Sequence, residues 1–193
     1  MKLFWRHGYE GTSLSDLTQE LGISRPSLYA TFGNKQQLFL KAFARYEEQA
    51  GAYRIRAQKE TSARAFARQL LKGAISLHTD RNNPPGCLGV QGALVCGDAA
   101  DPVRRELIAR RTMGFDAIRI RLERARAEGD LGNADPSDLA RFLSATIYGI
   151  IILSIDGASQ KELTRLAETA LRAWPTSATP HEAIATKRMR PKR

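Results

Sequence analysis

Residues 11–35 read GTSLSDLTQELGISRPSLYATFGNK, and this stretch decides the fold. Ser13, followed three residues later by Asp16, forms a capping-box pattern that starts a short helix. Gly22 suits the tight turn after this helix, because glycine adopts left-handed backbone geometry without a steric penalty. Ser24 is then placed to cap a second short helix. Two short helices joined by a glycine-containing turn predict a helix-turn-helix.

The same stretch also marks where a third helix begins. Gly33 closes the second helix, and Asn34 with Gln37 at the third helical position predicts a new start. We expect this helix to run to about residue 57 and to connect two parts of the chain. The three predicted helices are residues 14–21, residues 25–32 and the longer helix from Asn34 to about residue 57.

The second helix has an outer face suited to the DNA major groove. On a helical wheel, Leu28 and Phe32 point toward the core and small side chains point away, so the helix can approach base edges closely. Arg25 in the first turn is placed to contact a guanine, and Tyr29 and Lys35 suit phosphate contacts. By spacing alone, a plain helical hairpin with a solvated outer face is the alternative. The candidate DNA-binding residues are Thr12, Ser13, Ser24, Arg25, Pro26, Ser27, Tyr29, Ala30, Thr31 and Lys35.

The rest of the chain predicts helices throughout. Apolar residues recur at a period of 3.6, and no sustained alternation of period two indicates a strand. Breaks fall at residues 82–86, 98–102, 129–136 and 157–159, where Gly, Pro, Asn, Asp and Ser gather. We therefore expect an all-α protein of eight or nine helices.

Length and charge bound the possible partners. The chain has 193 residues, 42% of them hydrophobic, and a formal net charge of +10, which favours nucleic acid, an anionic surface or anionic ligands as partners. Residues 1–50 hold six basic and five acidic side chains, so the helix-turn-helix carries little of this excess. Residues 176–193 are basic, with two prolines and few apolar residues, and we expect a disordered tail. This tail is either a nonspecific phosphate binder or a solvated end.

Several function classes find no support in the sequence. The longest nearly uncharged apolar run, residues 147–155, is shorter than a membrane span, and the first residues do not form a signal peptide. We expect a cytoplasmic protein with reduced cysteines and no membrane partner. No CxxC, HExxH, GxGxxG, P-loop or GxSxG motif occurs. An enzyme, a metal site and a cofactor are therefore not predicted.

Residues 3–39 closely resemble the DNA-binding domain of TetR-family (AcrR-like) transcriptional regulators. The residues that carry the resemblance are Asp16, Gly22, Ile23, Ser24, Ser27, Leu28, Tyr29, Phe32, Lys35 and Leu38. It implies a three-helix helix-turn-helix domain over residues 1–46, followed over residues 47–175 by a helical domain that binds a small molecule and dimerises. It also implies double-stranded operator DNA as a partner. Family members usually have a longer first helix, so this chain has an apparently shortened one.

Candidate sites in the second domain follow from its apolar positions. Each candidate has ordinary core packing as its alternative. For the ligand pocket we predict Leu70, Ile75, Leu94, Met113, Ile118, Leu122, Phe142 and Tyr148. For the dimer interface, which we place on the last two helices, we predict Ile147, Gly149, Ile151, Leu163, Leu166 and Ala170.

Two further groups leave alternatives open. Cys87 and Cys96 are either inert thiols or a redox or soft-metal sensor, and nine residues along one straight helix would put them on opposite faces. The arginines of residues 104–126 either bind an anionic ligand or form a solvated face, with Asp101–Arg105 and Glu106–Arg110 as pairs one turn apart.

The leading interpretation is a homodimeric repressor that binds a palindromic operator and is released by a small molecule. The alternative is a helical small-ligand-binding protein whose operator binding is impaired because its first helix is short.

Overall fold

The computed structural model describes residues 1–175, and the basic tail predicted for residues 176–193 lies outside them. The described residues form nine α-helices and one short 3₁₀ turn, without strands, so the predicted all-α class is confirmed. The elements are α1 (Lys2–His7), α2 (Leu14–Leu21), α3 (Arg25–Phe32), α4 (Lys35–Gln58), α5 (Ala63–His78), α6 (Leu88–Gln91), η1 (Asp98–Ala100), α7 (Asp101–Ala127), α8 (Pro136–Ile155) and α9 (Gln160–Arg172).

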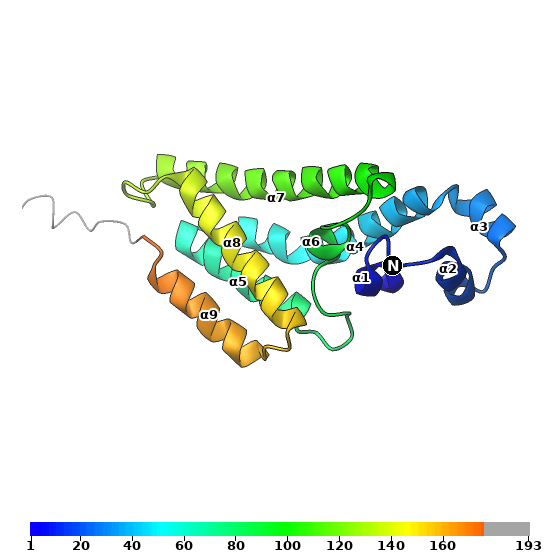
Figure 1. Cartoon of the computed structure of the whole chain (residues 1–193). Coiled ribbons are helices and arrows are strands. Elements are labelled where there is room, and N and C mark those ends of the chain that lie inside the picture. The colour runs from blue at the N-terminus through cyan, green and yellow to red at the C-terminus, as the bar shows by residue number, and fades with distance from the viewer. Residues whose placement is uncertain (176–193) are drawn as a thin grey trace, which may run out of the picture.

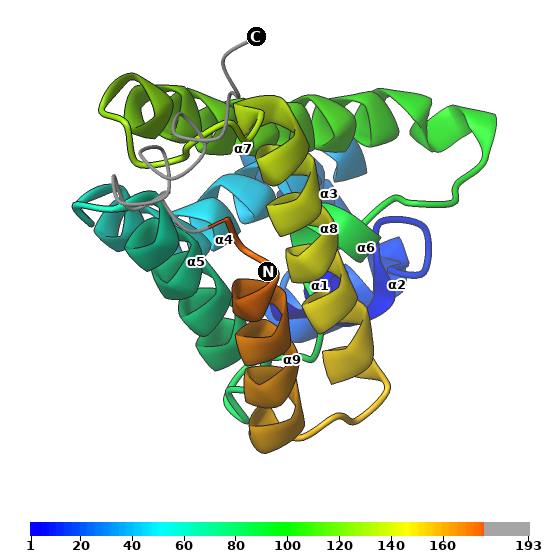
Figure 2. The same cartoon turned by 90° about the vertical axis from the view of Figure 1, so that its left-hand side faces the viewer.

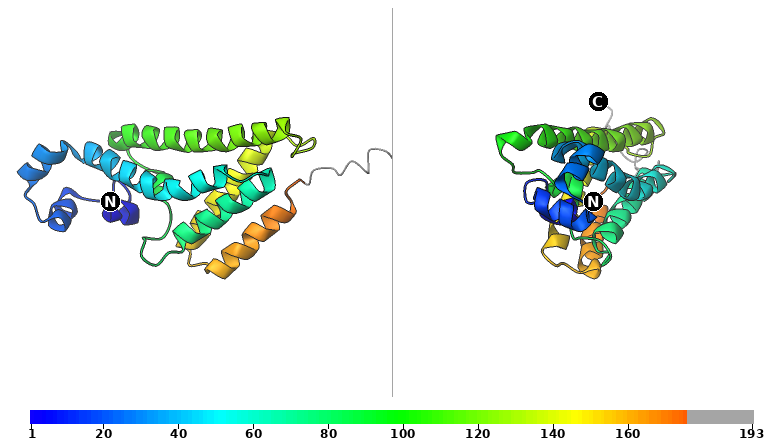
Figure 3. Two further views of the ribbon diagram at one scale, coloured as in Figure 1. Left: turned by 180° about the vertical axis from the view of Figure 1, so that it is seen from behind. Right: turned by 90° about the vertical axis from the view of Figure 1, so that its right-hand side faces the viewer.

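The molecule is elongated, with the helix-turn-helix at one end (Figure 1). Helix α4 leads from α3 into the larger helical part, and the view from behind shows the same connection (Figure 3). Helices α5 and α7 pack on α4 and on each other, α8 packs on α5 and α7, and α9 packs on α5 and α8. Helices α8 and α9 lie side by side on one face (Figure 2).

The predicted caps start the first helices of the chain. Ser13 Oγ accepts a hydrogen bond from Asp16 N at 3.0 Å, and the Asp16 carboxylate accepts one from Ser13 N at 2.8 Å. Gly22 ends α2 at φ 63°, in the left-handed region that favours glycine. Asn34 caps α4 through the same reciprocal pattern with Gln37. These local bonds satisfy backbone N–H groups that have no partner within the helix.

A cluster of aromatic side chains joins α1 to α4. Phe4 and Trp5 are 1% and 0% exposed, so the short first helix is fully docked. The Trp5 ring meets the Tyr46 ring edge-on at 4.7 Å between centroids, and Phe4 meets Phe39 in the same way at 5.1 Å. Phe43 continues the stack along α4. The core therefore runs continuously from the helix-turn-helix into the second domain, and α4 crosses the boundary proposed at residue 46 without a break.

Helix α8 is more apolar than the sequence interpretation allowed. The sequence interpretation considered only the nearly uncharged run of residues 147–155. By length and composition, the whole 20-residue helix is long and apolar enough to span a membrane, although it contains Asp138 and Arg141. The helix packs against α5, α7 and α9, and it buries Ala140, Leu143, Ile147, Ile150 and Ile151. In the most apolar segment of α8, 28% is buried, so much of the helix surface is exposed.

Candidate nucleic-acid interface and ligand pocket

The outer face of α3 is exposed as the helical wheel predicts. Leu28 is fully buried, and Pro26, Ser27 and Ala30 are exposed on the opposite side. Tyr29 is 47% exposed. The helix therefore presents small side chains flanked by one aromatic hydroxyl, a surface that can enter a major groove.

Arg25 is held by a neighbour that the sequence interpretation did not include. Its Nη2 donates a hydrogen bond to Ser15 Oγ on α2 at 2.8 Å. This contact fixes the guanidinium at the start of α3 while leaving its other N–H groups free to donate. Because a planar guanidinium donates through several N–H groups, the contact is compatible with bidentate recognition of a guanine.

Lys35 lies at the amino end of α4, where helix geometry favours anions. Its Nζ stands 4.6 Å from the centroid of the Tyr9 ring. Partial burial lowers the pKa of Lys35, and nearby Glu10 and Asp16 oppose this shift. The Lys35 side chain therefore lies over the Tyr9 ring at the amino end of α4, and helix amino ends favour phosphate groups.

Thr12 occupies a different place from the other predicted DNA contacts. Its side chain is 0% exposed, and its hydroxyl donates to Gly8 O at 2.7 Å. It therefore secures the turn after α1 and does not present a side chain on the outer surface. Ser13 and Ser24 are exposed, but their hydroxyls serve as caps of α2 and α3.

A cavity of about 310 Å³ lies in the second domain. Four of the eight predicted ligand residues line it: Leu70, Met113, Ile118 and Tyr148. The other four do not. Ile75 and Leu122 are ordinary core residues, at 4% and 0% exposed, while Leu94 and Phe142 are 57% and 39% exposed and face solvent. Helical periodicity predicts which residues form the apolar face of a helix. It does not predict which of those residues line a cavity.

The predicted dimer residues divide between the inside and the outside of the subunit. Ile147 and Ile151 line the cavity, and Leu163 is 1% exposed within the core, so these three side chains face the interior of the subunit. Gly149, Leu166 and Ala170 are partly exposed. Because α8 is apolar almost all round, its sequence does not reveal which stripe faces the domain's own core.

The sequence interpretation does not assign several polar residues to the cavity that they line: Tyr46, Tyr53, Arg54, His78 and Cys87. Tyr46 is buried and its hydroxyl donates to Cys87 Sγ at 3.0 Å. Burial, with the neighbouring thiol, raises the pKa of Tyr46 well above its ordinary value, so it remains a donor at neutral pH. No local motif marks these residues, because they come together from α4, α5 and the segment before α6.

One carbonyl links the cavity to the first helix. Gly86 O lies 2.9 Å from Trp5 Nε1 on α1 and 2.7 Å from His78 Nδ1 at the cavity wall. Because a carbonyl oxygen only accepts hydrogen bonds, the His78 proton must sit on Nδ1. Burial lowers the pKa of His78 to about 4, so the ring is neutral at pH 7. The Gly86 carbonyl therefore accepts one hydrogen bond from Trp5 in the first domain and one from His78 in the second.

The segment around α6 adds further contacts between the domains. Gln91 Nε2 donates to Trp5 O at 3.0 Å, and Tyr9 N donates to Gly92 O at 2.7 Å. Gly86 has φ 85°, and a Cβ there would lie 2.0 Å from Gln91 Oε1. Glycine is thus required at the position whose carbonyl joins the two domains.

The two cysteines are both free thiols. Cys87 is buried at the start of α6, and Cys96 lies beyond the end of that four-residue helix. The single straight helix expected to carry both is therefore absent. Among residues 1–175, no group of three or more His, Cys, Asp and Glu side chains is placed to hold a metal ion.

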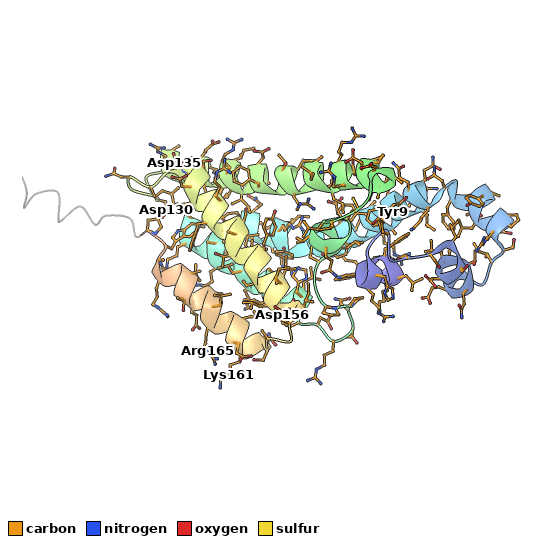
Figure 4. All side chains as sticks on the ribbon, in the orientation of Figure 1. Tyr9, Asp130, Asp135, Asp156, Lys161 and Arg165 are labelled. Carbon is orange, nitrogen blue, oxygen red and sulfur yellow. The ribbon has the colours of Figure 1, made fainter. Side chains whose placement is uncertain are left out.

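Both ion pairs predicted within α7 are present. Arg105 pairs with Asp101 at 3.1 Å, and Arg110 pairs with Glu106 at 2.7 Å. Arg121, however, is 5% exposed, so the helix does not carry a uniformly solvated basic face. The acidic residues Asp130 and Asp135 lie at the end of the molecule opposite the helix-turn-helix (Figure 4).

Comparison with known proteins places the chain among transcriptional regulators. The sequence model of bacterial regulatory proteins of the tetR family matches residues 1–42. The HTH-type transcriptional repressor ComR of Escherichia coli (strain K12) is 33% identical over 179 residues, which cover 91% of this chain and 85% of ComR. These matches extend well beyond the helix-turn-helix.

Solved structures agree with the sequence matches. A cysteine mutant of the TetR family transcriptional regulator CifR, complexed with 26-bp double-strand operator DNA, has a TM-score of 0.86 and 38% identity. The match covers 90% of this chain and 92% of that one. A putative TetR transcriptional regulator from Rhodococcus sp. RHA1 is 37% identical with a TM-score of 0.63, over 91% of this chain and 95% of its own.

Proposed function

The chain belongs to the TetR family of DNA-binding transcriptional regulators, and from this premise we propose that it is a homodimeric, ligand-responsive repressor. In this proposal the dimer binds a palindromic operator in the cytoplasm, and a small molecule in the second domain releases it. The single observation that carries the DNA-binding part is the exposed small-residue face of α3, with Arg25 held at its start.

The proposed release depends on coupling between the cavity and α1. A ligand changes operator affinity only if it binds the DNA-competent and DNA-incompetent conformations with different affinity. His78 at the cavity wall and Trp5 on α1 share Gly86 O, and α4 runs from the cavity to the amino end that carries Lys35. A ligand that displaces the segment around Gly86 would therefore shift α1 and its aromatic contacts on α4.

The proposed dimer rests on the exposed apolar stripe of α8. Phe142, Ile152 and Leu153 are 39%, 44% and 41% exposed, and Gly149 has nothing within 4 Å of an added Cβ. Spacings of seven, three and one residues put these four positions on one side of the helix. Helix α8 itself lies beside α9 (Figure 2). Contiguous exposed apolar area on a monomer marks an interaction surface. We place the twofold interface there, with Asp156, Lys161 and Arg165 near its edge (Figure 4).

DNA recognition can be tested by mobility shift with genomic fragments at several salt concentrations. Arg25→Ala should relax specificity at one base position, at a cost of about 1–3 kcal/mol for the preferred base. Lys35→Ala should weaken all sequences about equally and reduce the salt dependence. Sequence-indifferent, salt-steep binding would contradict the repressor and favour a ligand-binding protein with impaired operator binding. Identical behaviour of the two variants would contradict the separate roles.

The dimer can be tested by light scattering after size exclusion. Leu153→Asp should convert the dimer to a folded monomer, because the side chain is exposed within the subunit and needs no repacking there. Ile120→Asp on α7, also an exposed apolar side chain, is the matched control and should remain dimeric. A wild-type monomer at micromolar concentration would contradict the homodimer, and a dimer unaffected by Leu153→Asp would place the interface elsewhere.

A further inference from the structure

The cavity is lined by more positive than negative charge. Arg54, Arg110 and Arg111 contribute to its wall, and Glu47 is the acidic residue among the lining side chains. Arg110 is already neutralised, because it pairs with Glu47 at 3.0 Å and with Glu106 at 2.7 Å. Two arginines remain whose charge the lining does not balance.

Arg54 and Arg111 have no carboxylate partner among residues 1–175. Arg111 Nη1 donates to Gly89 O at 2.7 Å, which anchors the guanidinium and leaves other N–H groups free. Arg54 lies with its guanidinium carbon 5.7 Å from the centroid of the Tyr53 ring. Guanidinium groups placed on aromatic and carbonyl supports are pre-organised to receive a planar anion.

The two charges act on the same cavity. Burial raises the pKa of Tyr148, and the charges of Arg111 and Arg54 both oppose that rise. Arg54 also adds to the effect of burial in lowering the pKa of His78. Arg54 on α4 and Arg111 on α7 both line the cavity, so the field at their common neighbour Tyr148 is positive.

The remaining wall is apolar. Leu70, Met113, Ile118, Ile147 and Ile151 line the cavity, from α5, α7 and α8. Its volume of about 310 Å³ lies at the small end of ligand pockets. An occupant that satisfies both parts of this wall has an apolar body and one anionic end.

We propose that the effector is a small organic acid whose carboxylate binds Arg54 and Arg111 and whose apolar body packs on the isoleucines. This inference rests on the proposed function, since it names the chemical class of that ligand. A carboxylate held by both guanidiniums ties α4 to α7. The amino end of α4 directly follows α3 of the helix-turn-helix. A ligand bound to Arg54 on α4 should therefore change operator affinity.

The charge requirement can be tested with 2-naphthoate, 2-naphthamide and 2-naphthyl phosphate on the full chain. The first two share a ring system and differ in charge, while the third replaces the carboxylate with a phosphate. Calorimetry should show 2-naphthoate binding at least about tenfold more tightly than the amide, because charge-assisted hydrogen bonds are stronger than neutral ones. Equal binding of acid and amide, or no binding of the acid, overturns the proposal. Tighter binding of the phosphate overturns the assignment to carboxylic acids.

Variants locate the anion within the cavity. Arg54→Met should weaken 2-naphthoate by about tenfold or more while leaving the weak affinity for the amide unchanged. Arg56→Met, two residues along the same helix and not part of the cavity wall, is the matched control and should bind like wild type. Arg111→Met should repeat the Arg54→Met result, and Arg54→Lys should recover part of the affinity. Retention of full 2-naphthoate affinity by both Met variants overturns the proposal, even if either variant is less stable.

Operator binding separates this inference from the function on which it rests. The mobility shift of operator DNA without any acid tests the repressor, and calorimetry without DNA tests the site. Addition of 2-naphthoate should then reduce operator affinity in wild type and in Arg56→Met, with little effect in Arg54→Met. Acid binding without any operator binding would contradict the proposed function and leave the ligand class supported.

Discussion

The buried His78 ring should make the protein sensitive to acid well above the range in which carboxylates titrate. Its pKa is about 4 in the folded protein, against an ordinary value of 6.5. Between these values the unfolded chain binds a proton that the folded chain does not, so acid stabilises the unfolded state. The stability contributed by neutral His78 is therefore present at pH 7 and is lost as the pH falls through 6.5 toward 4.

The magnitude follows from the size of the shift. Over the full range, 2.5 pH units correspond to about 3 kcal/mol. Between pH 7 and pH 5 the same two pKa values give a loss of about 2 kcal/mol in the free energy of unfolding. For a chain of this length, that loss lowers Tm by roughly 4–8 °C.

Thermal unfolding followed by circular dichroism at pH 7, 6 and 5 measures this loss. Protomer concentration and ionic strength are held fixed, because association changes apparent stability. His78→Asn is the comparison, since its amide N–H can replace Nδ1–H as the donor to Gly86 O and cannot titrate. We expect His78→Asn to be less stable than wild type at pH 7 and to lose about 2 kcal/mol less between pH 7 and pH 5.

The difference between the two pH profiles removes the contribution of the other titrating groups. Parallel profiles for wild type and His78→Asn between pH 7 and pH 5 would refute the reasoning. Such a result would mean that His78 is not held neutral behind Gly86, and the described link between the cavity and α1 would lose one of its two hydrogen bonds.

Three further perturbations test how the fold is held together. Trp5→Phe removes the indole N–H that Gly86 O accepts, and it should lower Tm by roughly 5 °C in a thermal scan, because a buried acceptor loses one partner. Asn34→Ala removes the α4 cap and should cost about 1 kcal/mol in urea unfolding, while an unchanged midpoint would show that the cap is replaced. The buried Arg121 Nε and Nη1 have no hydrogen-bond partner in residues 1–175, so removing this charge relieves a cost. Arg121→Met should therefore be close to neutral in the same assay, because it also keeps the packing on Phe66. Arg121→Ala should destabilise measurably, because it loses that packing.

The helix-turn-helix could be predicted in detail because its signals are local. A cap acts over three residues, and a tight turn depends on the backbone freedom of one glycine, so Ser13, Gly22 and Asn34 report directly on their own surroundings. For this reason the bounds that the sequence predicts for the helices at residues 14–21 and 25–32 are the observed ones. Thr12 is the exception in this region, because its burial depends on contacts that α1 makes after docking.

The cavity could be predicted only in part. Leu70, Met113, Ile118 and Tyr148 were found from helical periodicity, but the polar half of the wall was missed. Arg54 and Arg111 are 57 residues apart in the sequence, on α4 and α7, and nothing in the local sequence of either indicates a shared space. The same limit explains why Ile147 and Ile151, predicted for the dimer interface, are found at the cavity.

The sequence by itself determined the helical class, the helix starts and turns, and which residues of α3 are exposed on its outer face. It also indicated that the specific contacts would come from a few placed residues, because little of the +10 charge lies in residues 1–50. Tertiary structure alone decided which side of α8 borders the cavity, that Arg54 and Arg111 share it, and that Gly86 O joins Trp5 to His78. The physical reason is range: caps and turns act within one helical turn, whereas a cavity and an interdomain hydrogen bond exist only after distant helices have packed.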